Sequence, residues 1–214
     1  MNSLGFDKKE SDTKVIVAMS GGVDSSVAAV KLKKEGYDVT GVTLKLYNQV
    51  NTSKSKSCCA GIDINDAKKV AKQYNFSHLV LDYQEKFYDG VISNFIDSYA
   101  NGETPVPCIQ CNQTVKFTDL LEESKKLNAD ALVTGHYAIR RGGLKGSKLF
   151  KAKDTSKDQS YFLFATLQDQ LDYVRFPLGE YLKTEIRQMA EEFKLTVSDK
   201  PDSQDICFVT SDSY

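Results

Sequence analysis

A short segment near the N-terminus has the residue types that bind phosphate. It reads Ser20-Gly21-Gly22-Val23-Asp24-Ser25-Ser26 and lies between an apolar run at 14–19 and a helical pattern at 23–35. A tight turn in that place aims backbone N–H groups and the positive end of the helix dipole at one point, which favours an oxyanion. The glycines leave room for phosphate, and the Asp24 carboxylate can hold Mg²⁺ between phosphates. We therefore predict that this loop binds the phosphates of a nucleotide.

Two better-known phosphate-binding patterns are absent from this loop. It contains neither the Gly-Lys-Ser/Thr of the Walker loop nor the G-x-G-x-x-G of dinucleotide-binding folds. The alternative is an ordinary tight turn at the start of a helix. The agreement of strand, turn, serine hydroxyls and Asp24 favours nucleotide binding over that alternative.

The chain has five cysteines, an odd number in a sequence without a secretory signal. Such a count favours thiol chemistry or metal binding over structural disulfides. Cys108 and Cys111 form a C-x-x-C just before a predicted helix, whose dipole is expected to stabilise the Cys111 thiolate. Cys207 lies among acidic and polar residues, and Cys58 and Cys59 are expected to pack at the start of another helix.

Apolar runs alternate with helical patterns along the first two thirds of the chain, which is typical of an α/β fold. Strands are expected at 14–19, 39–46, 77–83 and 130–134, and helices at 23–35, 63–74, 84–100 and 113–126. The first strand, turn, helix and strand form a βαβ unit, so the sheet is predicted to be parallel. A hairpin formed by 137–139 and 149–151, then two or three short helices, are expected to follow.

This change of pattern divides the chain into three predicted parts. Residues 1–13 are polar and are expected to form a disordered lead-in, residues 14–140 the α/β domain, and residues 141–214 a hairpin and helical lobe that carries Cys207. The composition, 41% hydrophobic and 27% charged, is that of a soluble globular protein. No apolar stretch approaches the length that spans a membrane, and the N-terminal segment resembles neither a signal nor a transit peptide. We expect a cytoplasmic protein.

Basic side chains and a histidine after residue 135 are further site candidates. The net charge of −1 gives no support to nucleic-acid binding, although local lysines suffice to contact phosphates. Such contact is predicted for five lysines near the hairpin: Lys145, Lys148, Lys151, Lys153 and Lys157. His136 follows a buried strand at the edge where α/β sheets bind ligands, so a place in the site and a structural hydrogen bond are both open.

The loop at 20–26 resembles the pyrophosphate loop (PP-loop) of the ATP-pyrophosphatase superfamily. This resemblance implies an adenine nucleotide alpha hydrolase-like fold and adenylation of a carbonyl-type oxygen. Five further segments, in family order, narrow the resemblance to the tRNA-specific 2-thiouridylases. They are Thr104 to Asn112, Thr134 to Ala138, Lys157 to Leu163, Phe176 to Gly179, and Asp202 to Phe208.

The resemblance implies a role for individual residues. Cys111 matches the nucleophilic cysteine of the family, and Cys207 matches the cysteine that carries a persulfide. The residues that match ATP-binding positions are Ala18, Met19, Ser20, Gly21, Gly22, Val23, Asp24, Ser25, Leu44 and Gly135. Those that match tRNA-contacting positions are Val106, Pro107 and Cys108, near the target base, and Lys157, Asp158 and Gln159.

The reaction implied by this resemblance is ATP-dependent sulfur transfer to C2 of the wobble uridine, position 34 of tRNA. ATP, with Mg²⁺, adenylates the C2 oxygen. A persulfide on Cys207, loaded by a sulfur carrier or a donor derived from a cysteine desulfurase, then delivers sulfur. Cys111 resolves the persulfide through a transient disulfide with Cys207, or assists the transfer.

Two departures from the family pattern leave alternatives open. Cys108 stands where many members have aspartate, so Cys108, Cys111 and Cys207 could together hold a [4Fe–4S] cluster through three thiolates, and a catalytic role for Cys108 stays open. The sequence ends at Tyr214, where members continue into a β-rich C-terminal region, so a nucleotide-binding fragment that needs this region is the second hypothesis. A third, another adenylating enzyme such as a ligase, is disfavoured by Cys111 and Cys207 in their matching contexts.

Overall fold

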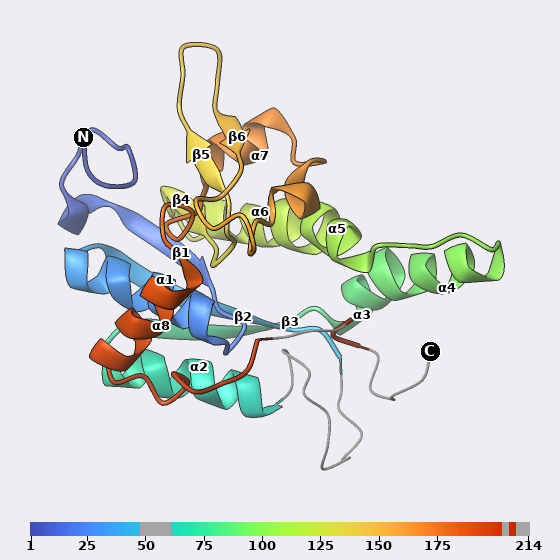
Figure 1. Cartoon of the computed structure of the whole chain (residues 1–214), viewed down its shortest axis with the longest axis horizontal. Helices are drawn as coiled ribbons and strands as arrows, with labels where there is room; N and C mark the ends of the chain where they lie inside the picture. Colours follow the sequence, from blue (N-terminus) through green and yellow to red (C-terminus); the bar gives the residue numbers. More distant parts are fainter. Residues whose placement is uncertain (48–60, 203–205, 209–214) are drawn as a thin grey trace.

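The computed structural model describes residues 1–47, 61–202 and 206–208. These parts contain a five-stranded parallel sheet in the order β3-β2-β1-β4-β7 (Figure 1). Its strands are β1 (Lys14–Ala18), β2 (Asp38–Lys45), β3 (Ser77–Asp82), β4 (Ala131–Val133) and β7 (Val174–Arg175). Helices cover both faces of the sheet, so the predicted α/β fold with a parallel sheet is confirmed.

One face of the sheet carries three helices: α1 (Val23–Glu35), α2 (Gly61–Gln73) and α8 (Lys183–Glu192). Val15 and Val17 of β1 share a buried cluster with residues of all three helices. Ile16, between them, belongs to a second cluster on the opposite face. Because successive side chains of a strand point to opposite faces, an unbroken apolar strand fits only a sheet covered on both sides.

The other face carries two continuous helical runs, each with a π-helical part. The first consists of α3 (Gln84–Phe87), η2 (Tyr88–Ile92) and α4 (Ser93–Ala100). The second consists of α5 (Pro107–Cys111), η3 (Asn112–Leu120) and α6 (Leu121–Lys126). This second run begins six residues before the predicted start at 113, with Pro107 in the first turn, where its missing N–H costs nothing. Within the described ranges, no helix is both long and apolar enough to cross a membrane.

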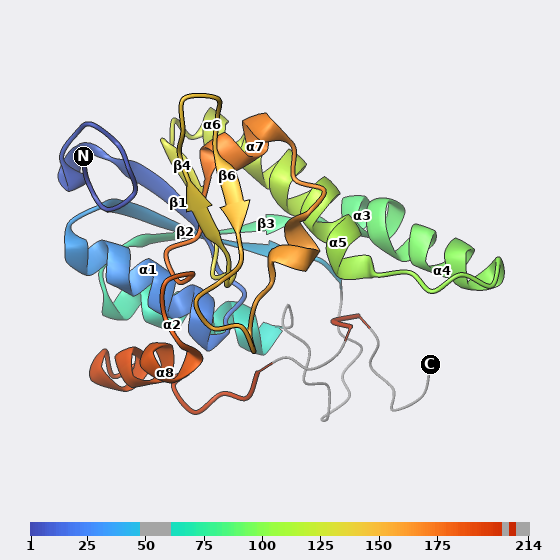
Figure 2. The same cartoon turned by 45° about the horizontal axis from the view of Figure 1, so that its top comes forward.

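The chain beyond β4 returns to the sheet. A hairpin of β5 (Ile139–Arg141) and β6 (Lys148–Phe150) extends away from it, as predicted to within two residues (Figure 2). The short helices η4 (Ser160–Leu163) and α7 (Gln168–Tyr173) follow, and β7 then pairs with β4. The sheet therefore does not end at the boundary predicted near residue 140. A two-residue strand has no periodicity that the sequence could reveal.

Residues 1–13 are not the disordered lead-in that their polar composition predicts. Leu4 is buried, and its carbonyl oxygen accepts a hydrogen bond of 2.8 Å from Nε of Arg175 in β7. Asn2 Nδ2 donates to Thr13 Oγ1 at 2.9 Å, and a short 3₁₀ turn, η1 (Glu10–Asp12), leads into β1. The contact with Arg175 joins the segment to a residue far along the chain, so its polar composition gives no sign of it.

Candidate active site

The serine- and glycine-rich loop joins the end of β1 to the start of α1. Gly21 has a φ of +76°, and a Cβ on it would lie 2.2 Å from the backbone oxygen of Asp63. Inside the turn, the Ser20 N–H donates to Ser25 Oγ at 3.1 Å. The first N–H groups of α1 have no acceptor within the helix, so the end of the helix that meets the loop favours an anion.

Replacing Gly21 with alanine is expected to lower the free energy of unfolding by about 1–3 kcal/mol. The added methyl group meets the Asp63 backbone, and the φ of +76° strains any side chain. Gly22→Ala is the matched control, since Gly22 has a φ of −87° and the nearest atom to an added Cβ is Ser20 Oγ at 3.4 Å. Urea denaturation of the three proteins measures the effect; equal losses in both variants would contradict this turn geometry.

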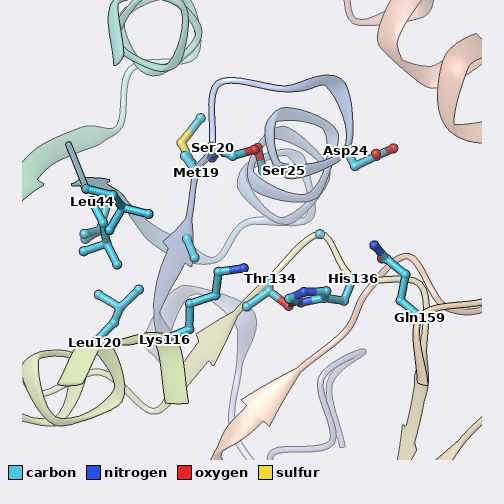
Figure 3. A pocket seen from close by; sticks show the side chains of 14 residues that line it. Met19, Ser20, Asp24, Ser25, Leu44, Lys116, Leu120, Thr134, His136 and Gln159 are labelled. Carbon is cyan, nitrogen blue, oxygen red and sulfur yellow. Dashed lines mark hydrogen bonds between the residues drawn. The ribbon is translucent and has the colours of Figure 1, made fainter. Parts of the chain in front are cut away.

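A cavity of about 290 Å³ opens beside the loop (Figure 3). It lies at the carboxyl ends of β1 and β4, where the chain order of the sheet reverses, which is the usual ligand crevice of open α/β sheets. Leu44 and Leu120 lie at one side of it, and Asp24 and Gln159 at the other. An apolar region beside a polar one suits an adenine base and its phosphates.

Most residues predicted to bind ATP line this cavity. They are Ala18, Met19, Ser20, Asp24, Ser25, Leu44 and Gly135. The remaining three do not line the cavity. Gly21 and Gly22 lie in the loop, and Val23, the first residue of α1, is buried in the core. The other lining residues are Val42, Leu46, Lys116, Leu120, Thr134, His136 and Gln159.

Asp24 is held by two partners from distant parts of the chain. Nζ of Lys183, in the first turn of α8, donates to both carboxylate oxygens at 2.7 Å, and the Tyr137 hydroxyl donates to Oδ1 at 2.8 Å. Burial first, and then the Asp24 charge, raises the pKa of Tyr137, so this hydroxyl stays protonated. Both Asp24 oxygens accept from Lys183 in this arrangement, and a role of Asp24 in holding Mg²⁺ stays a prediction.

Asp202 extends this network toward the C-terminal cysteine. Its carboxylate accepts hydrogen bonds from Lys157 at 2.9 Å and from Arg187 at 2.8 Å, and it lies 2.9 Å from Nζ of Lys183. The Lys183 ammonium therefore joins Asp24 of the nucleotide loop to a residue five positions before Cys207. Burial would raise the pKa of Asp202, but the hydrogen bonds from Lys157 and Lys183 outweigh it and lower the pKa to about 2.

Acid is expected to weaken the fold through Asp202. A lowered pKa means that the folded state favours the ionised carboxylate, so this stabilisation is complete above about pH 4 and is lost as the pH falls toward 2. A shift of this size corresponds to roughly 2 kcal/mol. The free energy of unfolding, measured against pH for the unmodified chain and Asp202→Asn, should differ by about that amount at pH 6 and converge near pH 2. A difference independent of pH would contradict the network.

The two cysteines expected to handle sulfur belong to one part of the core. Cys111 is buried in the cluster on the α5–α6 side of the sheet, and Cys207 and Phe208 pack against that cluster. The Phe208 ring makes edge contacts with Phe87 and Phe95, with centroid distances of 5.8 and 5.2 Å. These contacts anchor the segment of Cys207 on the same side of the sheet as Cys111.

The structure changes one expectation about these thiols and leaves another untested. Cys108, Cys111 and Cys207 form no disulfide, and the transient Cys111–Cys207 disulfide that the resemblance implies for the reaction stays a prediction. Cys111 is the fifth residue of a helix that begins at Pro107. The predicted help from the helix dipole therefore does not apply to Cys111, because that effect falls off within the first turn.

The described residues give no direct support for an iron–sulfur cluster on the cysteines, which stays an open alternative. Among the residues that the structure describes, no three His, Cys, Asp or Glu side chains gather in a way that could hold a metal ion. Cys108 is exposed, Cys111 is buried and Cys207 is half-buried. Cys58 and Cys59 lie outside the described residues.

His136 combines the two roles that the sequence leaves open. It lines the cavity, and its Nδ1 forms a hydrogen bond of 2.8 Å with Thr134 Oγ1. Its ring packs edge-on against Phe117 and Phe176, each with a centroid distance of 6.2 Å. Burial, with a smaller effect of the Lys116 charge, lowers the pKa of His136 to about 3. The imidazole is therefore neutral at physiological pH and brings no positive charge to a nucleotide.

Side chains of the segment 157–159, which is predicted to contact tRNA, form hydrogen bonds and an ion pair within the chain. Lys157 pairs with Asp202, and the Asp158 carboxylate accepts the N–H of Ala152 at 2.9 Å. Gln159 lines the cavity, and its Oε1 accepts the N–H of Tyr137 at 2.9 Å.

Most of the other residues predicted to contact tRNA are exposed. Four of the hairpin lysines, Lys145, Lys148, Lys151 and Lys153, are exposed. In the other predicted tRNA segment, Val106 and Cys108 are exposed and Pro107 is buried. Contact of either segment with tRNA stays a prediction.

A glycine- and serine-rich loop after a central parallel strand, opening on a cavity at the carboxyl edge of the sheet, defines a nucleotide-binding α/β domain. A family model described as the tRNA methyl transferase HUP domain matches residues 13–211. The chain belongs to that family.

Two solved structures share its fold at low identity. A U34-tRNA thiolase NcsA from Methanococcus maripaludis, solved with its [4Fe-4S] cluster, has a TM-score of 0.58 and 17% identity over 94% of this chain and 63% of its own. A 4-thiouridine synthetase–RNA complex with bound ATP has a TM-score of 0.57 and 19% identity over 88% of this chain and 43% of its own.

Curated relatives are much closer in sequence. The tRNA-specific 2-thiouridylase MnmA of Rhodospirillum centenum is 56% identical over 215 residues, which is 100% of this chain and 55% of the relative. The protein of the same name in Brucella canis is 55% identical over 100% of this chain and 54% of its own. The chain thus spans about half the length of these curated relatives.

Proposed function

We propose that this chain uses ATP to replace the C2 oxygen of uridine 34 in tRNA with sulfur, forming 2-thiouridine. One observation carries the proposal: a single helical run, 107–126, serves both halves of the reaction. Its side chains at Lys116 and Leu120 line the nucleotide cavity. Its Cys111 lies in the cluster against which Cys207 packs. An oxygen activated in the cavity and a sulfur carried on a cysteine would therefore meet beside this helix.

The first step is adenylation. The uridine O2 attacks the α-phosphorus of ATP, an O–P bond forms, and the bond to the bridging oxygen breaks so that pyrophosphate leaves with the electron pair. The N3 proton of uridine passes to water. The loop at 20–26 suits the departing pyrophosphate, because the N-terminal end of α1 stabilises negative charge. Mg²⁺ would neutralise phosphate charge when bound with ATP.

The second step is sulfur transfer. The terminal sulfur of a Cys207 persulfide attacks C2, the C2–O bond breaks, and AMP leaves with the former uridine oxygen. The Cys111 thiolate then attacks the Cys207 sulfur, which releases 2-thiouridine and leaves a Cys111–Cys207 disulfide. An external dithiol supplies the two electrons that restore both thiols. The persulfide itself comes from a sulfur carrier or a donor derived from a cysteine desulfurase, in the reducing cytoplasm.

The names of the relatives support sulfur transfer rather than methyl transfer. The family description mentions a methyl transferase, whereas the curated relatives are named 2-thiouridylases. Two cysteines beside a nucleotide cavity serve sulfur transfer and have no evident use in moving a methyl group. A second candidate, a nucleotide-binding unit that turns over only with a further region, is favoured by the half-length match to those relatives.

The test mixes the chain with ATP, Mg²⁺, a persulfide donor and unmodified tRNA, and looks for 2-thiouridine at position 34 by mass spectrometry. The proposal predicts product that depends on both ATP and donor. ATP binding without any product would instead support the second candidate. Absence of ATP binding would contradict both candidate functions.

A further inference from the structure

Lys116 is a cation on the wall of the nucleotide cavity that the steps above leave without a role. It is the only lysine or arginine among the described residues that line the cavity. Figure 3 shows its amino group pointing toward Thr134, next to His136. Its charge helps to lower the pKa of His136, which agrees with this placement. Since the imidazole is neutral, Lys116 carries the positive charge on that wall.

The π-helical geometry of η3 brings Lys116 toward the face of Cys111. Residues three and four apart are neighbours in an α-helix, and a residue five apart lies on a different face. In a π-helix the hydrogen bonds run from i to i+5, so residues five apart come back to the same side. Cys111 directly precedes η3, and Lys116 follows it by five positions. The cation and the thiol are thereby joined to one face of one rigid element.

The contents of the cavity indicate which phosphate this cation would meet. Pyrophosphate belongs at the loop and the start of α1, and the apolar side at Leu44 and Leu120 suits the base. The α-phosphate must lie between these two places. Lys116 approaches this middle region from the helix of Cys111, the side from which a uridine would enter under the proposed function.

We propose that Lys116 binds the α-phosphate of ATP and stabilises the negative charge that develops on it when the uridine oxygen attacks. The identity of the attacking group rests on the proposed function. The contact between Lys116 and the α-phosphate does not. A preorganised cation acts most strongly where charge grows in the transition state. Lys116 is thus a catalytic residue of the adenylation step.

Three variants test the assignment: Lys116→Met, Lys116→Arg, and Lys126→Met as the control. Lys126 lies on the same helical run, is exposed and pairs with Glu123 at 2.7 Å, away from the cavity. At saturating ATP, Lys116→Met should slow tRNA-dependent pyrophosphate release about 100-fold or more, a loss typical of one removed transition-state donor. Arginine should restore the rate to within about tenfold, and Lys126→Met should leave it unchanged. A rate within threefold of the unmodified chain for Lys116→Met would overturn the proposal.

A binding measurement tests the phosphate contact without any turnover. Titration of Lys116→Met with ATP, AMP and adenosine should show weaker binding of ATP and AMP, each by about tenfold, and unchanged binding of adenosine. A loss for ATP with none for AMP would place Lys116 on the outer phosphates and overturn the proposal. Equal losses for all three ligands would mean a structural role and also overturn it. If the unmodified chain releases no pyrophosphate with tRNA, the proposed function fails while this binding series still decides the role of Lys116.

Discussion

Replacing Cys207 with serine is expected to abolish formation of 2-thiouridine, with a loss of at least about 1,000-fold, because a hydroxyl cannot carry a persulfide. Cys111→Ser should cause a loss of similar size in multiple-turnover assays, since the mixed disulfide is no longer resolved. Both variants should bind ATP as the unmodified chain does, because neither cysteine lines the cavity. Mass spectrometry of the tRNA and calorimetric titration with ATP give the two readouts.

Cys108→Ser is the matched control for the thiol variants. Cys108 is exposed, and the described residues hold no cluster of three metal-ligating side chains. Its replacement should therefore change the thiolation rate by less than about tenfold. A loss as large as that of Cys207→Ser would contradict this account and return Cys108 to a catalytic or ligand role.

Gly135→Ala is expected to weaken ATP binding by about 100-fold or more, because an added Cβ would lie 2.8 Å from the Ser25 nitrogen and 3.0 Å from the Asp24 carbonyl carbon. Both atoms belong to the backbone of the phosphate loop, which must shift to make room. The variant should keep its fold, since the crowded atoms lie at the edge of the cavity.

The control for Gly135 is a glycine with open surroundings. A Cβ on Gly142, in the hairpin region, meets only the flexible Arg140 side chain at 3.7 Å. Gly142→Ala should leave ATP affinity within about twofold. Titration with ATP measures both variants. Undiminished affinity in Gly135→Ala would mean that the loop does not hold the phosphates in the described conformation.

Much of the fold and half of the site follow from local sequence patterns. The strands β1 and β2 can be predicted because they are rich in β-branched residues, and the loop between β1 and α1 has the residue types that bind phosphate. The cavity then forms where the carboxyl ends of these strands must meet. Leu44 and Gly135, assigned through the family resemblance, also line it.

The parts that the sequence could not predict depend on contacts between distant residues. Lys183 meets Asp24 across 159 positions, and no local pattern in α8 distinguishes this lysine from an exposed one. Lys116 gains its position from a π-helical register, for which the sequence carries no periodicity signal. The two-residue strand β7 and the packing of segment 1–13 could not be predicted either, because both depend on contacts between residues far apart in the chain.

Under the proposed function, the network through Asp202 connects the nucleotide site with the region that precedes Cys207. Lys183 contacts Asp24 in the nucleotide loop and Asp202, five residues before Cys207. Lys157, from a segment that matches a tRNA-contacting region, meets the same carboxylate. Under the proposed function, the charges of a bound nucleotide would thus act on Asp202, close in sequence to Cys207.

The fate of the uridine oxygen shows whether adenylation precedes sulfur transfer. A tRNA substrate with ¹⁸O at C2 of uridine 34 is incubated with the chain, ATP and a persulfide donor. The mass of the released AMP is then measured by mass spectrometry. Adenylation of the uridine oxygen predicts that each 2-thiouridine formed is matched by one AMP heavier by the label. Unlabelled AMP together with 2-thiouridine would contradict the account, because the oxygen would then have left by a route that never joined it to phosphorus.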